Sequence, residues 1–121
     1  MKKIIFIEDE PALQKTLGEV LKQEGYEVTS ASDGEMGLKS IRQKQPDLIL
    51  LDLILPKING FEVLKQIKED VKTKDIPVIV LTNLERVEDV EKVVKYGATT
   101  YLVKSQYSME ELIQKIKKII G

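Results

Sequence analysis

Charged and polar side chains come directly after several apolar segments of this chain. The acidic run Glu8-Asp9-Glu10 follows IIFI, and Asp52 interrupts the aliphatic run LILLDLIL of residues 48–55. Thr82 ends the run PVIVLT, and Lys104 ends the run TTYLVK. Burying an unpaired ionised carboxylate is costly. A carboxylate surrounded by aliphatic residues therefore needs a partner or a function.

Carboxylates, a hydroxyl and an ammonium that meet at one place could bind a metal ion and a phosphate. Clustered carboxylates repel one another unless a cation is present, and their oxygens are ligands that Mg²⁺ and Mn²⁺ prefer. The chain contains no His and no Cys, which argues against zinc. Lys104 could pair with phosphate oxygens, and Thr82 could donate a hydrogen bond to them. An Asp in such a site can also act as a nucleophile and form an aspartyl-phosphate.

Two alternating sequence patterns would position these side chains. Five short apolar runs are typical of β-strands: residues 3–7, 26–31, 48–52, 77–82 and 99–104. The segments between them carry apolar residues at helical spacing. Asn59 is expected to cap the third helix, and Ser108 with Glu111 forms a capping box for the last one. Gly25 and Gly97 stand where helices are expected to end.

Five strand–helix units in a row predict an α/β fold. We expect a five-stranded parallel sheet, doubly wound with five helices and joined by right-handed crossovers. The runs at 3–7, 48–52 and 77–82 are apolar throughout, as strands covered on both faces are. The run at 26–31 alternates polar and apolar residues, and the run at 99–104 begins with two Thr. Both are therefore expected at the edges, which favours the strand order 2-1-3-4-5, with an exchange of the two edges left open.

This strand order would bring the polar groups together. In a parallel sheet all carboxyl ends lie along one edge, and ligands bind beyond that edge where the strand order reverses. Here that place is between the first and third strands, so Glu8, Asp9 and Asp52 should meet there, with Thr82 and Lys104 close by. Asp52 would then end its strand at a functional edge of the sheet, which explains its position in an aliphatic run.

The bulk composition narrows the function classes further. The 121 residues fit a single domain, 1–121. A net charge of −1 gives no reason to expect nucleic acid or an anionic membrane as a partner. No apolar run approaches the ~20 residues of a membrane span, and the start MKKIIFIEDE is too short in apolar residues for a signal peptide. We therefore expect a cytoplasmic domain.

These residues, in this order and at these strand ends, give the whole chain a resemblance to a known family. The sequence resembles the response-regulator receiver domains of bacterial two-component signalling, which are similar to chemotaxis regulators and have a flavodoxin-like fold. Each matching motif is weak alone, but together they are specific. The residues that carry the resemblance are Glu8, Asp9, Asp52, Pro56, Gly60, Thr82, Tyr101 and Lys104.

The resemblance implies a phosphoacceptor function. Asp52 would accept the phosphoryl group. Mg²⁺, or Mn²⁺, would be bound by Asp9, Asp52 and the backbone carbonyl of Ile54, with Glu8 acting through a water molecule. The donor would be a phosphohistidine on a sensor histidine kinase or phosphotransfer protein, consistent with the absence of His here. The chain would not be an enzyme in the usual sense, because it would only catalyse transfer to itself and slow hydrolysis of its own acyl phosphate.

The resemblance also implies a switch. Lys104 would pair with a phosphoryl oxygen, and Thr82 would move to hydrogen-bond the group. Tyr101 would then turn inward into the vacated space. The surface formed by the fourth helix, fifth strand and fifth helix would change for an unknown downstream protein. Pro56 and Gly60 would set the geometry of the loop after the acceptor.

Four residues depart from the family pattern. Ser105 follows Lys104 where the family usually has a Pro with a cis peptide bond, which costs roughly 2.5–4 kcal/mol without Pro. The loop before the last helix is therefore expected to differ. Asn83 stands where a very small residue is usual and could narrow access to the phosphoryl group. Leu84 and Ile54 place aliphatic groups where polar ones would orient a water, so we expect slow self-dephosphorylation.

Three other functions compete with that of a phosphoacceptor. A degenerate receiver could bind partners without phosphorylation, which Asn83 and Ser105 leave open. A Mg²⁺ phosphatase with an Asp nucleophile would want a second Asp at position 54, where the chain has Ile. A flavin-binding protein of this architecture would want a hydroxyl- and Gly-rich phosphate loop after the first strand, and EDEPALQK has the opposite charge.

Overall fold

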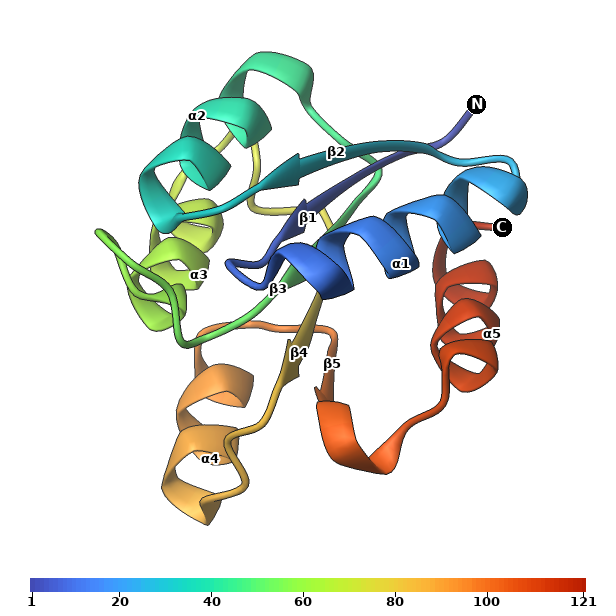
Figure 1. The fold of residues 1–121 in the computed structure, drawn as a ribbon. Coiled ribbons are helices and arrows are strands. Elements are labelled where there is room, and N and C mark those ends of the chain that lie inside the picture. Colours follow the sequence, from blue (N-terminus) through green and yellow to red (C-terminus); the bar gives the residue numbers. More distant parts are fainter.

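The β-strands form one parallel sheet in the computed structural model, which describes residues 1–121 (Figure 1). The strand order is β2-β1-β3-β4-β5, and every neighbouring pair is parallel. Both the order and the edge positions of β2 and β5 confirm the prediction. The strands are β1 (Lys3–Ile7), β2 (Glu27–Ala31), β3 (Leu48–Leu51), β4 (Val78–Thr82) and β5 (Thr100–Val103).

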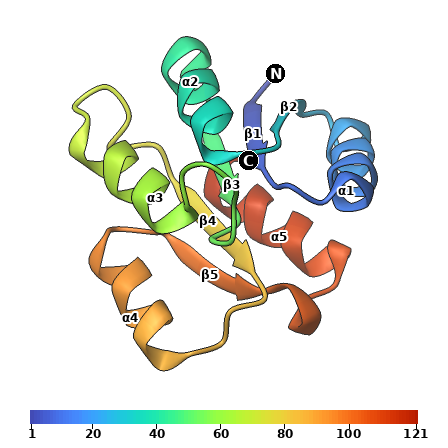
Figure 2. The same cartoon turned by 60° about the vertical axis from the view of Figure 1, so that its left-hand side comes forward.

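Helices cover both faces of the sheet, as predicted. Figure 2 shows α1 and α5 on one side and α2, α3 and α4 on the other. A single 3-10 turn, η1, links β5 to the last helix. The helical segments are α1 (Pro11–Gln23), α2 (Gly34–Lys44), α3 (Gly60–Glu69), α4 (Val87–Lys95), η1 (Lys104–Gln106) and α5 (Met109–Ile120).

Two apolar layers hold the helices to the sheet. Strand β3 is buried at every position because its side chains alternate between the layers. Leu48 and Leu50 pack with α1 and α5, whereas Ile49 and Leu51 pack with α2 and α3. A continuous aliphatic run is therefore required here, and it ends where the polar site begins.

The helix ends follow the predicted capping residues. Asn59 Oδ1 accepts a hydrogen bond from Glu62 N at 3.0 Å at the start of α3, and Ser108 with Glu111 forms the capping box of α5. Gly25 and Gly97 follow α1 and α4 with φ of +96° and +97°, a conformation that favours glycine. Each side-chain cap typically stabilises by ~1 kcal/mol.

Several strand boundaries differ from the prediction by one residue, and β4 and β5 each begin one residue later than expected. Asp52 lies just after β3 and begins the next loop. Tyr26 precedes β2 and is buried in the apolar layer that contains α1 and α5. Lys104 starts η1 because the pairing of β5 with β4 stops at Thr82 and Val103. All peptide bonds are trans, including Lys104–Ser105, as expected for a Ser at that position. No helix combines the length and apolar character that crossing a membrane requires.

Candidate functional site

The sheet brings the predicted polar residues to one edge. Ile7 of β1 pairs with Leu51 of β3, so Glu8 and Asp52 emerge side by side at the next position of each strand. Asp52 N donates to Ile7 O at 3.1 Å, which continues the ladder by one bond. Lys104 follows the last paired residue of β5. The convergence inferred from strand order is therefore present in the fold.

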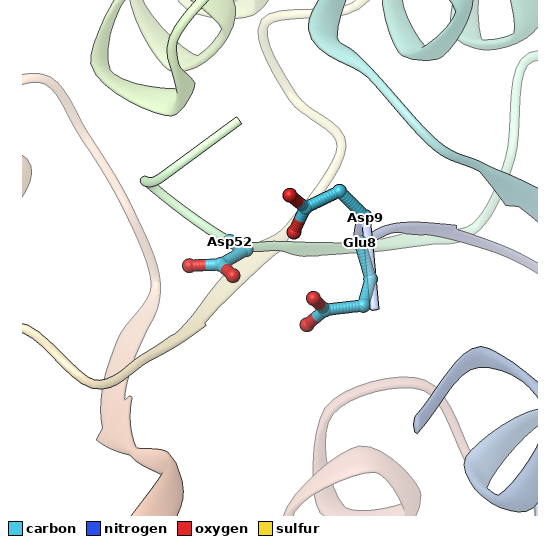
Figure 3. A group of neighbouring side chains, drawn as sticks. All are labelled: Glu8, Asp9 and Asp52. Carbon is cyan, nitrogen blue, oxygen red and sulfur yellow. The ribbon is translucent and has the colours of Figure 1, made fainter. Parts of the chain in front are cut away.

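Three carboxylates lie together at the ends of β1 and β3 (Figure 3). One oxygen each of Glu8, Asp9 and Asp52 falls within 4.8 Å of the others. Glu8 is 1% exposed and Asp52 is 5% exposed, whereas Asp9 is open to solvent. The group therefore has a buried side and an accessible side.

Lys104 is the cation that pairs with the two buried carboxylates. Its Nζ lies 2.5 Å from Glu8 Oε1 and 3.0 Å from Asp52 Oδ2. Burial alone would lower the pKa of Lys104, but its hydrogen bonds and charge interactions with Glu8 and Asp52 outweigh this and raise the pKa. Lys104 is therefore held in its charged form at the acceptor.

One ammonium does not balance three carboxylates. Burial raises the pKa of Glu8, and the negative charge of Asp52 adds to this, despite the opposing effect of Lys104. Burial is the main cause of this raised pKa, and pairing with Lys104 does not fully offset it. The donor set consists only of oxygens and is open at Asp9. These residues therefore fit a hard divalent cation such as Mg²⁺ or Mn²⁺.

The loop after β3 is held close to the acceptor. Ile54 N donates to Asp52 Oδ1 at 3.3 Å, and Pro56 O accepts from Ile58 N at 2.8 Å. Gly60 N donates to Leu53 O at 2.9 Å. An added Cβ at Gly60 would lie 2.2 Å from Asp52 O, so only glycine lets α3 begin this near the acceptor. The backbone carbonyl of Ile54 as a metal ligand stays a prediction.

Thr82 and Tyr101 occupy the other side of the site. Thr82 is fully buried, and its Oγ1 has no hydrogen-bond partner. The half-buried Tyr101 packs against the core, and its hydroxyl donates to Leu84 O at 2.5 Å. Burial raises the pKa of Tyr101, and nearby carboxylates add to this, so the hydroxyl keeps its proton. Whether either residue switches stays a prediction.

Sequence reasoning missed two hydrogen-bonding groups beside the site. Gln14 Nε2 of α1 donates a hydrogen bond to Glu8 O and another to Ser32 Oγ, which lies 3.2 Å away. These bonds hold the residue that follows β1 in place. Gln106 Nε2 donates to Glu85 Oε1 at 2.9 Å and joins η1 to the loop after β4. Polar residues on helices and turns usually face solvent, so the sequence carries no signal for these contacts.

Comparison with known proteins decides the family. The family model described as response regulator receiver domain matches residues 4–117. The chain belongs to this family. The acidic cluster of this receiver domain fits a phosphoacceptor site, and no finding favours the phosphorylation-independent alternative.

Several known proteins are similar to this receiver domain. It is 38% identical over 120 residues to the DNA-binding dual master transcriptional regulator RpaA of Synechocystis, covering 99% of this chain and 49% of RpaA. It is 32% identical over 121 residues to Protein PilH of Pseudomonas aeruginosa, covering 100% and 99% of the two chains. The Mn²⁺-bound crystal structure of response regulator Rcp1 is 34% identical with a TM-score of 0.85, covering 98% and 91%. The chain spans about half the length of RpaA and of several other curated relatives.

Proposed function

We propose that residues 1–121 act as one receiver unit that accepts a phosphoryl group on Asp52 from the phosphohistidine of a partner protein. The observation that carries the proposal is the contact of Lys104 with Asp52 at the centre of the carboxylate cluster. It places a fixed cation beside the nucleophile, where a transferred phosphoryl group would need one. The donor would be a sensor histidine kinase or phosphotransfer protein. The reaction with that partner would take place in the cytoplasm.

The reaction is a transfer between two nucleophiles. One carboxylate oxygen of Asp52 forms a bond to phosphorus while the P–N bond of the donor imidazole breaks. The departing nitrogen keeps the electron pair. Lys104, already 3.0 Å from Asp52 Oδ2, pairs with a phosphoryl oxygen as the group arrives. The chain catalyses this step only on itself, so we do not propose an enzyme with an external substrate.

A divalent cation completes the charge balance of the proposed site. Asp9 and Asp52, with the main-chain carbonyl of Ile54, would hold Mg²⁺ or Mn²⁺, and bound Mn²⁺ in the similar protein Rcp1 supports a divalent cation at this site. The ion would neutralise charge on the transferring group. A water-mediated place for Glu8 beside the ion follows only from the family resemblance.

Two further residues would couple phosphorylation of Asp52 to a change at the protein surface. Thr82 Oγ1 is buried without a partner, and a phosphoryl oxygen on Asp52 would provide one. Tyr101 is already half-buried and bonded to the loop after β4 through Leu84. Movement of Thr82 would therefore bias the packing of Tyr101 and the surface of α4, β5 and α5, where a downstream protein would bind.

Intact-protein mass measurement tests the proposal. The chain is incubated with acetyl phosphate and Mg²⁺, or with EDTA in place of Mg²⁺. We expect one phosphoryl-sized increase that requires Mg²⁺. Borohydride reduction and tryptic digestion should then locate the modification in the peptide of residues 45–57. No adduct under donor excess, including at short times, would instead support a degenerate receiver that acts by binding alone.

The lifetime of the phosphoryl group gives a separate prediction. Ile54 is 57% exposed at the site, and Leu84 lies on the opposite loop. Neither aliphatic group can orient an attacking water, so we expect slow self-dephosphorylation. Ile54→Asn should speed the loss of phosphate by several-fold to about tenfold, measured by intact mass after donor removal. Val71→Asn, at a more exposed position (79%) on another loop, is the control. A wild-type half-life of seconds in Mg²⁺ would contradict the expectation.

A further inference from the structure

The loop after β3, residues 52–59, contains a strained turn. Lys57 has a φ of +67°, and across it Ile58 N donates a hydrogen bond to Pro56 O at 2.8 Å. Together these features describe a γ-turn with positive φ at its centre, which is a rare and strained conformation. A residue other than glycine stays in such a conformation only where the surrounding structure holds it there. The contacts of the turn therefore show what fixes the loop.

The first turn of α2 packs directly against this loop. Gly34 N donates to Pro56 O at 3.3 Å, so this carbonyl accepts one hydrogen bond from α2 and one from within the turn. An added Cβ at Gly34 would lie 2.0 Å from Ile58 O and 2.8 Å from Ile58 C. Both are backbone atoms of the loop, so only glycine allows α2 to approach it this closely.

Asp33 fixes the first turn of α2 where this contact requires it. Asp33 is 7% exposed. Its Oδ1 accepts a hydrogen bond from Met36 N at 2.8 Å as the cap of α2, and its Oδ2 lies 3.8 Å from Lys57 Nζ. Because the side chain of Lys57 is 59% exposed, this ion pair contributes little by itself. The cap and the close contact of Gly34 are therefore the main link between α2 and the loop.

We propose that Gly34 is a positioning residue for the metal site: it holds the loop after β3 so that the main-chain carbonyl of Ile54 is placed for a cation at Asp52. This inference rests on the proposed function, in which that carbonyl and Asp52 bind the ion. It gives α2, which contributes no ligand, a part in binding the metal.

Two anchors fix the loop on either side of the proposed ligand. Gly60 N donates to Leu53 O at 2.9 Å, and Gly34 N donates to Pro56 O at 3.3 Å. Ile54 lies between these two anchored residues. Groups that orient a metal ligand from outside the coordination shell raise metal affinity, because less of the ligand's freedom is lost when the ion binds. Displacing Pro56 would therefore weaken binding without removing any ligand.

Mn²⁺ affinity, followed by electron paramagnetic resonance, tests the proposal. We expect Gly34→Ala to weaken binding about tenfold or more, because its Cβ displaces the backbone of the loop. Gly37→Ala is the matched control on the same helix, since the atoms nearest to an added Cβ there belong to the side chain of Ile7. It should weaken binding less than about threefold. No loss in Gly34→Ala, or equal losses in the two variants, would overturn the proposal.

Two substitutions at Asp33 provide a test that does not depend on whether Gly34→Ala folds. Alanine removes the cap of α2, whereas asparagine keeps an oxygen for Met36 N. Mn²⁺ binding should weaken about three- to fivefold in Asp33→Ala and stay within about twofold of the wild type in Asp33→Asn. Circular dichroism checks that both variants fold. An unchanged affinity in Asp33→Ala would contradict the role of α2.

Amide hydrogen exchange measures the anchoring of the loop without metal or phosphodonor. Exchange at Ile58 N should be at least about tenfold faster in Gly34→Ala than in the wild type, and unchanged in Gly37→Ala. An unchanged rate in Gly34→Ala would show that α2 does not hold the loop.

The outcomes for the loop and for the phosphoacceptor can be told apart. A wild type that binds Mn²⁺ but accepts no phosphoryl group would refute the phosphoacceptor function, and the variants would still decide the role of Gly34. A wild type that binds no Mn²⁺ would overturn the inference about Gly34, whatever its reaction with acetyl phosphate.

Discussion

Asp52→Asn is expected to abolish phosphoryl acceptance, with a loss of at least about a thousandfold in rate. The amide oxygen of Asn is a poor nucleophile and carries no charge, so the bond to phosphorus does not form. The fold should remain intact, because Lys104 keeps its ion pair with Glu8 and one buried carboxylate of a repulsive group is removed. The phosphoryl mass increase is measured under acetyl phosphate and Mg²⁺ for both proteins.

Asp47→Asn is the matched control for this experiment. Asp47 lies in the same tryptic peptide, but at the opposite end of β3, where its Oδ2 accepts from Lys3 N at 2.7 Å. The Asp47→Asn variant should show the same phosphoryl mass increase as the wild type. An undiminished adduct in Asp52→Asn would move the acceptor to another carboxylate and refute the assignment.

Gly60→Ala is expected to destabilise the chain by about 3 kcal/mol or more. An added Cβ would lie 2.2 Å from Asp52 O and 2.4 Å from Leu53 Cα. Both are backbone atoms at the end of a fully buried strand, so neither can move without displacing the acceptor. We therefore expect a lower midpoint in urea, followed by circular dichroism, together with slower phosphorylation of the remaining folded protein.

Gly18→Ala provides the contrast for this substitution. Gly18 also lies in a helix, α1, but an added Cβ there meets nothing within 4 Å. Alanine should therefore stabilise by roughly 0.5–1 kcal/mol through its higher helix propensity. If the free energy of unfolding of Gly60→Ala lies within about 1 kcal/mol of the wild-type value, α3 does not require glycine to approach the acceptor.

The pattern of apolar residues was sufficient to predict the sheet and its order. β3 is LILL and lies between two helical layers, whereas β2 and β5 carry Thr at half-buried edge positions. A strand that is covered on both faces needs apolar residues at every position, whereas an edge strand does not. The caps at Asn59 and Ser108 were also predictable, because a helix cap depends on residues within one turn of each other.

The membership of the site was likewise visible in the sequence, because topology alone brings the carboxyl ends of β1, β3 and β5 to one edge. The sequence did not show how the acidic residues of the site differ in burial and in ion pairing. Glu8, Asp9 and Glu10 are consecutive acids that look equivalent in the sequence, yet one is buried and paired with Lys104 while the other two are exposed. Burial and ion pairing depend on atoms contributed by residues far along the chain. The tertiary structure alone therefore decided which acid faces the lysine, which faces the open side, and how close Gly60 must come to Asp52.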